Sequence, residues 1–206
     1  VDLDLAGCNA EFAVGCTYKF LNAGPGAPAF IYVRPDLAET IQPILSGWLG
    51  HAAPFAFDRD YAPGAGIDRM RVGTPAILQM TALDAALDVW DTVDLSDLRA
   101  ASVALSEHLI AAVTKACPDL ALASPRDPAM RGSQICFAHP EGYPIMQALI
   151  ARGVIGDFRA PNIIRFGITP LFQSMDDMDH VADTLAQIMD QRLWDQPDYK
   201  IRANVT

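Results

Sequence analysis

One lysine lies in a setting that favours covalent chemistry. The segment from Gly15 to Gly26 is G-C-T-Y-K-F-L-N-A-G-P-G, and Lys19 stands in it between Tyr18 and Phe20. Glycines let other groups approach the backbone closely, and aromatic neighbours shield an ammonium group from water. Such desolvation lowers the pKa of a lysine and suits one that forms an imine. The alternative is a lysine that snorkels at a strand end, and residue chemistry alone favours this alternative.

An arginine interrupts an apolar run near the C-terminus. Arg165 stands between Ile164 and Phe166 in a segment that we expect to be a mostly buried strand. A buried guanidinium is costly unless it has an anionic partner. Two partners remain open at this point, an ion pair with Asp157 or a bidentate contact with a ligand carboxylate.

Two further segments could bind an anion. The run S-G-W-L-G-H carries Trp48, whose indole N–H can only donate, and His51. Thr74 and Pro75 predict a helix start, with threonine as the cap and proline at the first helical position. A helix N-terminus with a hydroxyl group suits a phosphate. The structural alternatives are a surface loop with one partly buried tryptophan and an ordinary N-cap.

Three motifs resemble those of the kynureninases, which are fold-type I, class V enzymes that use pyridoxal 5'-phosphate (PLP). They are the T-Y-K-F-L-N-A-G-P-G run around Lys19, the G-W-x-G-H run at 47–51, and the run G-V-I-G-D-F-R-A-P-N-I-I-R-F-G-I-T-P-L-F at 153–172. The resemblance covers nearly the whole chain but only the C-terminal half of a kynureninase. It implies an α/β fold: the C-terminal part of the large PLP-binding domain at 1–92 and a small C-terminal α/β domain at 93–206.

The resemblance also implies roles for single residues. Lys19 would carry the cofactor and move a proton at the substrate, and Tyr18 would contact the cofactor phosphate and transfer protons. Trp48 and Thr74 would reach the phosphate of the partner subunit's cofactor in a homodimer with shared active sites. Arg165 would bind the substrate α-carboxylate, while His51 would line the substrate pocket or hold its loop.

The activity implied by the resemblance is hydrolysis of L-kynurenine, or its 3-hydroxy form, to an anthranilate and L-alanine in tryptophan catabolism. The alternatives are another class V PLP enzyme, such as an aminotransferase or a cysteine desulfurase, and a non-catalytic dimerisation piece. The family's phosphate-binding loop, stacked aromatic ring and pyridinium-binding aspartate lie in the N-terminal half. We therefore expect that these residues alone are inactive and that a preceding segment completes the enzyme.

The helices and strands that must position these residues are predicted from the spacing of apolar residues and from the glycine and proline residues that end such segments. We expect a buried helix after Thr74 that continues to Trp90, and polar tail residues that fray. We expect 55–66 to be irregular because it is rich in proline, glycine and aspartate. The remaining strands are expected at 12–14, 29–33, 120–123, 134–138 and 162–168, and the remaining helices at 94–116, 143–152 and 178–193, with a helical turn after Pro35.

Composition narrows the possible partners. The 206 residues are 51% apolar and carry a formal net charge of −10, which argues against nucleic acid and anionic membranes as partners. No apolar run approaches the roughly 20 residues that a membrane span needs. The chain begins at Val1 with no leader-like segment, and its four cysteines lack metal-ligand spacing. We therefore expect a cytoplasmic protein with reduced thiols and no metal.

Overall fold

The computed structural model describes residues 3–202, and the chain divides between Val93 and Asp94 into two compact units. We call them the N-terminal unit and the C-terminal unit and describe each by itself. None of the helices described here is long and apolar enough to cross a membrane. The predicted domain boundary lies one residue away from the division between the units.

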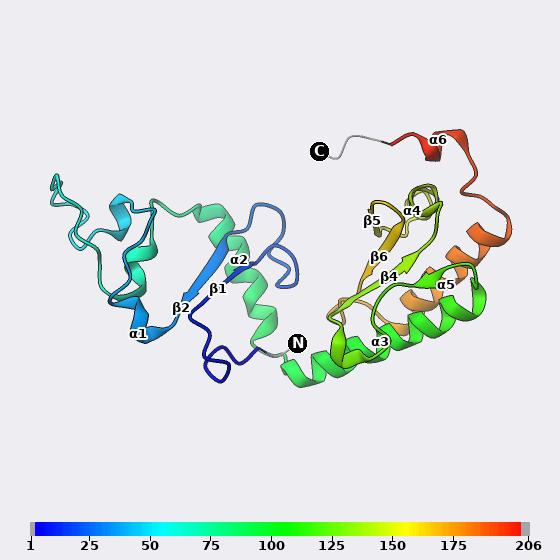
Figure 1. Cartoon of the computed structure of the whole chain (residues 1–206), viewed down its shortest axis with the longest axis horizontal. Helices are drawn as coiled ribbons and strands as arrows, with labels where there is room; N and C mark the ends of the chain where they lie inside the picture. The colour runs from blue at the N-terminus through cyan, green and yellow to red at the C-terminus, as the bar shows by residue number, and fades with distance from the viewer. Residues whose placement is uncertain (1–2, 203–206) are drawn as a thin grey trace. The chain divides into compact units, whose positions relative to one another are not determined.

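A two-stranded antiparallel sheet opens the N-terminal unit (Figure 1). Strand β1 (Phe12–Cys16) pairs with β2 (Ala29–Val33), with Phe12 opposite Val33 and Cys16 opposite Ala29. The predicted strands are therefore confirmed, and the glycine-rich segment is the link between them. Since two strands alone form a marginal sheet, the link depends on further packing for its shape.

Short helical turns and one long helix complete the N-terminal unit. They are α1 (Pro35–Ala38), the 3-10 helices η1 (Trp48–Gly50) and η2 (Gly66–Met70), and α2 (Ile77–Trp90). Arg69 is buried and ties these parts together, because its guanidinium donates to the Gly64 carbonyl at 3.1 Å and to the Ile41 carbonyl at 3.0 Å. The same guanidinium forms an ion pair with Glu39 at 3.4 Å. The Arg69 side chain thus joins the irregular segments that contain Gly64 and Ile41.

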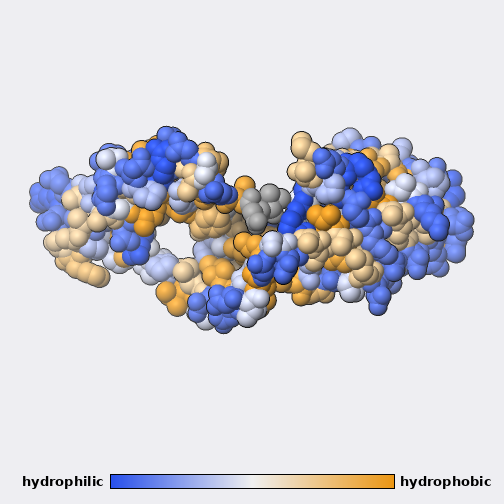
Figure 2. All heavy atoms as spheres, turned by 90° about the horizontal axis from the view of Figure 1, so that it is seen from below, coloured by the Kyte–Doolittle hydropathy of each residue, from blue (hydrophilic) through white to orange (hydrophobic). Residues whose placement is uncertain are grey.

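The expectation that α2 is a buried helix is wrong for this unit. None of its residues is buried, and Leu78 is 82% exposed. Apolar residues, in orange, also lie at the surface of this unit in Figure 2. The apolar sequence of α2 shows that the helix favours contact with other apolar groups, but the described N-terminal unit supplies too few of them.

The C-terminal unit is an antiparallel sheet covered by helices. Its strands are β3 (Ala121–Leu122), β4 (Gln134–Ala138), β5 (Asp157–Arg159) and β6 (Ile163–Gly167), in the order β3-β4-β6-β5. The helices are α3 (Leu95–Ala116), η3 (Pro128–Met130), α4 (Gly142–Ile150), α5 (Met175–Asp190) and α6 (Pro197–Lys200). Helices α3 and α5 lie side by side, and α4 packs against β5 and β6 (Figure 1).

Side chains alternate between the two faces of the sheet along β4 and β6, and this alternation decides which of their residues belong to the core. Ile135 and Phe137 of β4 and Ile164 and Phe166 of β6 are buried, whereas the residues between them are only partly covered. The buried side chains join those of α3, α4 and α5 in one apolar cluster. Arg165 therefore belongs to the opposite face of the sheet, as the period of two along a strand requires.

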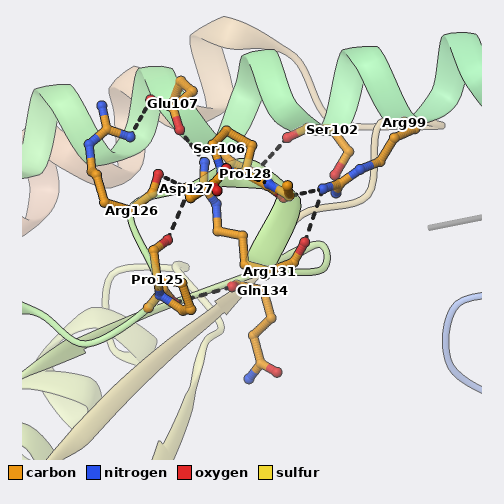
Figure 3. Close-up of polar contacts among 12 residues, drawn as sticks. Arg99, Ser102, Ser106, Glu107, Pro125, Arg126, Asp127, Pro128, Arg131 and Gln134 are labelled. Carbon is orange, nitrogen blue, oxygen red and sulfur yellow. Dashed lines mark hydrogen bonds and ion pairs between the residues drawn. The ribbon is translucent and has the colours of Figure 1, made fainter.

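A buried arginine fixes the loop between β3 and β4 to helix α3 (Figure 3). The side chain of Arg131 is only 3% exposed, and it donates to the carbonyls of Pro125 at 3.0 Å and Arg126 at 2.6 Å. It also pairs with Glu107, which accepts a second ion pair from the Arg126 side chain. The two guanidinium groups hold the pKa of the Glu107 carboxyl below its usual value. Nearby, Arg99 donates to the Pro128 carbonyl at 2.6 Å.

Helix and strand predictions in the C-terminal unit are largely confirmed. Asp94 caps α3 by accepting from the backbone N–H groups of Ser96 and Asp97, and β4 has the predicted bounds. Helix α5 begins at Met175, three residues earlier than predicted, because Ser174 and Asp177 form a capping box. Strand β5 was not predicted, and the short helix α6 lies in the tail that was expected to fray.

Candidate active site

The link that carries Lys19 is held in shape by its own backbone. Thr17 is buried, and its hydroxyl donates to the Pro28 carbonyl at 2.5 Å across the two ends of the link. Asn22 has φ +61°, and Gly24 has φ +79°. The left-handed region suits glycine and, among other residues, asparagine best. The turn itself therefore favours asparagine at position 22 and glycine at position 24 of the motif.

Lys19 and Tyr18 lie together on the exposed side of this link. The Lys19 Nζ atom lies 5.0 Å from the centroid of the Tyr18 ring, within the range of a cation–π contact. The Phe20 ring instead packs on Trp90 of α2, with 5.4 Å between ring centroids. The expected shielding of Lys19 is wrong within the described chain, since both Tyr18 and Lys19 are exposed. Burial of the amine needs groups other than those of the N-terminal unit.

Trp48 is placed beside the segment that carries Thr74. A Cβ atom on Gly47 would lie 1.8 Å from the Val72 carbonyl oxygen, so the backbones at these two positions are in direct contact. A Cβ on Gly73 would lie 3.7 Å from the Trp48 Nε1 atom. The fold of the N-terminal unit therefore brings the indole N–H next to the residue that precedes Thr74, although Gly73 comes 25 positions after Trp48 in the sequence.

The predicted N-cap role of Thr74 is wrong. Helix α2 begins at Ile77, its N-cap residue is Ala76, and no side chain caps it. Pro75 and the extended backbone at Ala76 delay the first helical turn, because the chain reaches helical dihedral angles only at Ile77. Thr74 is exposed and lies in the loop that enters α2. Its hydroxyl is therefore not used by the helix.

Three side chains of the N-terminal unit offer donors that suit a phosphate group. They are the Tyr18 hydroxyl, the Trp48 indole N–H and the Thr74 hydroxyl, and none of them makes a hydrogen bond within residues 3–202. With the amine of Lys19, this set matches the chemistry of PLP, which needs an amine for its aldehyde and donors for its phosphate. The residues present therefore fit the cofactor that the sequence implies.

His51 is committed to its own loop through both ring nitrogens. Its Nδ1 atom accepts from the Ala53 backbone N–H at 2.9 Å, so Nε2 carries the proton and lies 3.2 Å from the Asp60 carbonyl. Its ring also packs edge-on against Tyr61, with 5.7 Å between centroids. These contacts favour loop support over direct chemistry, of the two roles considered for His51.

A hollow of about 510 Å³ lies beside Trp48 and His51. Aromatic side chains of the irregular segment form much of its wall, and the Phe55 ring packs on Trp48 with 5.9 Å between centroids. Sequence reasoning treated 55–66 only as irregular and missed this hollow. The available signal was the spacing of Phe55, Phe57 and Tyr61, which are close together in a loop directly after His51. Part of the N-terminal unit can therefore receive an apolar group.

Arg165 belongs to the C-terminal unit and is paired with Asp157. Strands β5 and β6 place the two residues directly opposite each other, and the Arg165 Nη2 atom donates to Asp157 Oδ2. Asp157 also accepts from Arg159 Nη1 at 3.2 Å through its other oxygen. The ion pair considered from the sequence is thus present. The Arg165 side chain is 26% exposed, so it is also accessible to a ligand carboxylate.

Comparisons with known proteins agree with the motifs. Residues 98–185 match the family model of the kynureninase C-terminal domain. The chain is 43% identical over 208 aligned residues to a kynureninase of Pseudomonas fluorescens and 46% identical to one of Burkholderia mallei. Each alignment covers 100% of this chain and 50% of the relative, so the chain spans about half the length of the curated relatives it matches.

Solved structures show the same fold at much lower identity. One is a variant of C-DES with glycine covalently linked to its PLP cofactor, with TM-score 0.75 and 20% identity over 89% of this chain and 48% of that chain. Another is the apo cysteine desulfurase from Thermococcus onnurineus NA1, with TM-score 0.74 and 15% identity over 91% and 49% of the two chains. The predicted α/β fold class is therefore confirmed. The sequence matches show that the chain is similar to about half the length of the kynureninases, including their C-terminal domain.

Proposed function

We propose that this chain is the C-terminal half of a PLP-dependent kynureninase. The complete enzyme hydrolyses L-kynurenine, or 3-hydroxykynurenine, to L-alanine and anthranilate or 3-hydroxyanthranilate. The observation that carries the proposal is identity of 43–46% to kynureninases in alignments that cover the whole chain. The C-DES structure and the cysteine desulfurase structure are 20% and 15% identical and support the fold alone, so a desulfurase is the less favoured function.

Lys19 is the residue that we propose for proton movement at the substrate. Its amine first holds the cofactor and, once released by the substrate amine, takes the proton from the substrate α-carbon as a general base. PLP, when bound, supplies the electron sink that this proton loss and the cleavage of the Cβ–Cγ bond require. Tyr18 lies against the Lys19 amine and is the candidate for proton transfer in later steps.

Arg165 is the proposed anchor for the substrate α-carboxylate. A guanidinium binds a carboxylate through two parallel hydrogen bonds, which fix orientation as well as position. The partly exposed side chain on the face of the sheet opposite the core supports this role. The orientation of the substrate matters because its α-carbon proton must point towards the Lys19 amine for proton transfer.

We further propose that two copies of the enzyme share their active sites. The Trp48 indole N–H lies beside Gly73, the residue before Thr74, and the family resemblance assigns the donors of Trp48 and Thr74 to the cofactor phosphate of the partner subunit. The N-terminal half supplies the remaining cofactor contacts, so the 206 residues alone are inactive. The four free cysteines are consistent with a cytoplasmic enzyme.

The test is an assay of the complete polypeptide to which these residues belong, alongside the 206-residue chain. With PLP and L-kynurenine, we expect the complete polypeptide to release anthranilate and L-alanine in equal amounts. The isolated chain should release neither product. Exchange of amino groups without anthranilate would identify an aminotransferase, and turnover by the isolated chain would show that it needs no further segment.

A further inference from the structure

Three side chains form a polar row across the sheet of the C-terminal unit. The register places Asp157 of β5 opposite Arg165 of β6, and Arg165 opposite Cys136 of β4. Directly opposed residues of neighbouring strands point to the same face. This face is the one away from the buried residues Ile164 and Phe166. Asp157 is therefore paired with Arg165 by the register of the sheet and not by a flexible loop.

The arginine is held by one edge of its guanidinium. Nη2 of Arg165 donates to Asp157, and the neighbouring Nε atom on that edge is buried and has no hydrogen-bond partner within residues 3–202. Because Nε is covered and Nη2 is engaged, a ligand cannot approach this edge side-on. The terminal edge, which Nη1 and the outer N–H of Nη2 form, is the part that remains for an incoming anion.

The charges around this group set what it can accept. Asp157 is shared between two guanidinium groups, since Oδ1 accepts from Arg159 and Oδ2 from Arg165. Two cations and one anion leave one positive charge, which a single carboxylate neutralises. A second carboxylate at the same place would meet uncompensated repulsion from Asp157.

We propose that Asp157 is a positioning residue that presents the terminal edge of Arg165 to a substrate with one carboxylate. This inference rests on the proposed function for the identity of that substrate. Asp157 does not touch the reacting atoms. It fixes the guanidinium plane, and through this plane it sets the angle at which the substrate carboxylate binds.

The test combines Asp157→Ala with a substrate that lacks the carboxylate. Binding of L-kynurenine and of the amine formed by its decarboxylation is measured by titration of the complete PLP-loaded protein, and KM and kcat are measured for kynurenine. We expect kynurenine to bind about 10- to 100-fold more weakly to the variant, which is the effect of disturbing one charge-assisted contact. Binding of the amine should stay within about twofold of that to the parent protein, a difference worth less than about 0.5 kcal/mol.

Two further variants make the result specific. Asp157→Asn keeps an oxygen that accepts from Nη2, so its affinity for kynurenine should fall less than that of Asp157→Ala. It also serves as the test if the alanine variant does not fold. Asp195→Ala is the matched control, because Asp195 is also shared by two cations, Arg192 and Lys200, in the same unit. This control should bind both ligands as the parent does.

Each other outcome overturns the inference. Equal weakening of both ligands would show that Asp157 has a general structural role, and unchanged or tighter binding of kynurenine would show that it is idle or competes with the substrate. The ligand titrations decide between these cases even if the parent protein does not hydrolyse kynurenine. Absence of hydrolysis would instead count against the proposed function.

Discussion

The backbone of Gly47 lies directly against the carbonyl group of Val72, so closely that a Cβ atom at position 47 would be 1.8 Å from the carbonyl oxygen. This contact joins the loop that carries Trp48 to the loop that carries Thr74. The loops that carry the two donors assigned to the cofactor phosphate are thereby held together by main-chain packing.

Replacing Gly47 tests this arrangement. Gly47→Ala forces the two loops apart, because no flexible side-chain end can move away to make room. We expect a loss of about 1–3 kcal/mol in the free energy of unfolding, typical of overpacking, together with weaker PLP binding. Gly132→Ala is the control, since nothing lies within 4 Å of its added Cβ. Denaturant unfolding and PLP titration of the complete protein measure both effects, and equal behaviour of the two variants would contradict the assignment.

Replacing Lys19 tests the covalent role. The chain contains only three lysines, at positions 19, 115 and 200. Lys19→Ala removes the amine that we assign to the cofactor, so the visible absorption band of the PLP-loaded protein should disappear and hydrolysis should fall by several orders of magnitude. Lys115→Ala, on the exposed side of α3, should keep both the band and the activity. A visible band that survives in Lys19→Ala would exclude this lysine.

Replacing Arg165 separates substrate binding from cofactor binding. With Arg165→Ala we expect KM for kynurenine to rise about 100-fold or more, since a bidentate charge-assisted contact is lost. The affinity for PLP should change little, because the cofactor contacts proposed for this chain lie in the N-terminal unit. Steady-state kinetics and PLP titration give the two quantities. A drop in PLP affinity with unchanged KM would make Arg165 a purely structural residue.

The ion-pair network around Glu107 predicts that replacing Arg131 lowers the free energy of unfolding more than replacing Arg126. The Arg131 side chain is 3% exposed and that of Arg126 is 63% exposed, and both pair with Glu107. Arg131→Ala leaves one oxygen of Glu107 and two loop carbonyls without their donor, at about 1–3 kcal/mol for each unsatisfied buried acceptor, so it should lower the free energy of unfolding by about 3 kcal/mol or more. Arg126→Ala removes an exposed pair and should cost at most about 1 kcal/mol.

The same network predicts a dependence on pH. The two arginines lower the pKa of Glu107 in the folded protein, so the folded state favours the ionised carboxylate more than the unfolded state does. The stabilisation is therefore present above the unfolded-state pKa, which is about 4.3 for glutamate, and is lost as pH falls through the lower folded-state pKa. When denaturant unfolding is measured from pH 7 to pH 3, the free energy of unfolding should fall less for Glu107→Gln than for the parent chain.

Local sequence signals predicted a helix end or a strand well where a single segment contained all the residues that determine it. Asp94 as a cap, Gly153 at the end of α4 with φ +85°, and the alternation in β4 and β6 all give elements close to those observed. Thr74 shows the limit of such signals, because a good cap residue followed by proline did not start the helix. The extended backbone at Ala76 places the start of the helix at Ile77 instead.

The sequence by itself determined the chemistry of the site, namely a lysine beside a tyrosine, a donor-only indole, and a guanidinium on a strand. It did so because residue type fixes which groups can donate, accept or react. Only the tertiary structure decided that Trp48 lies beside Gly73, that both ring nitrogens of His51 are occupied, and that Asp157 accepts from Nη2 of Arg165. These are relationships between residues distant in the chain or on neighbouring strands, and they follow from packing and strand register, which residue types alone do not specify.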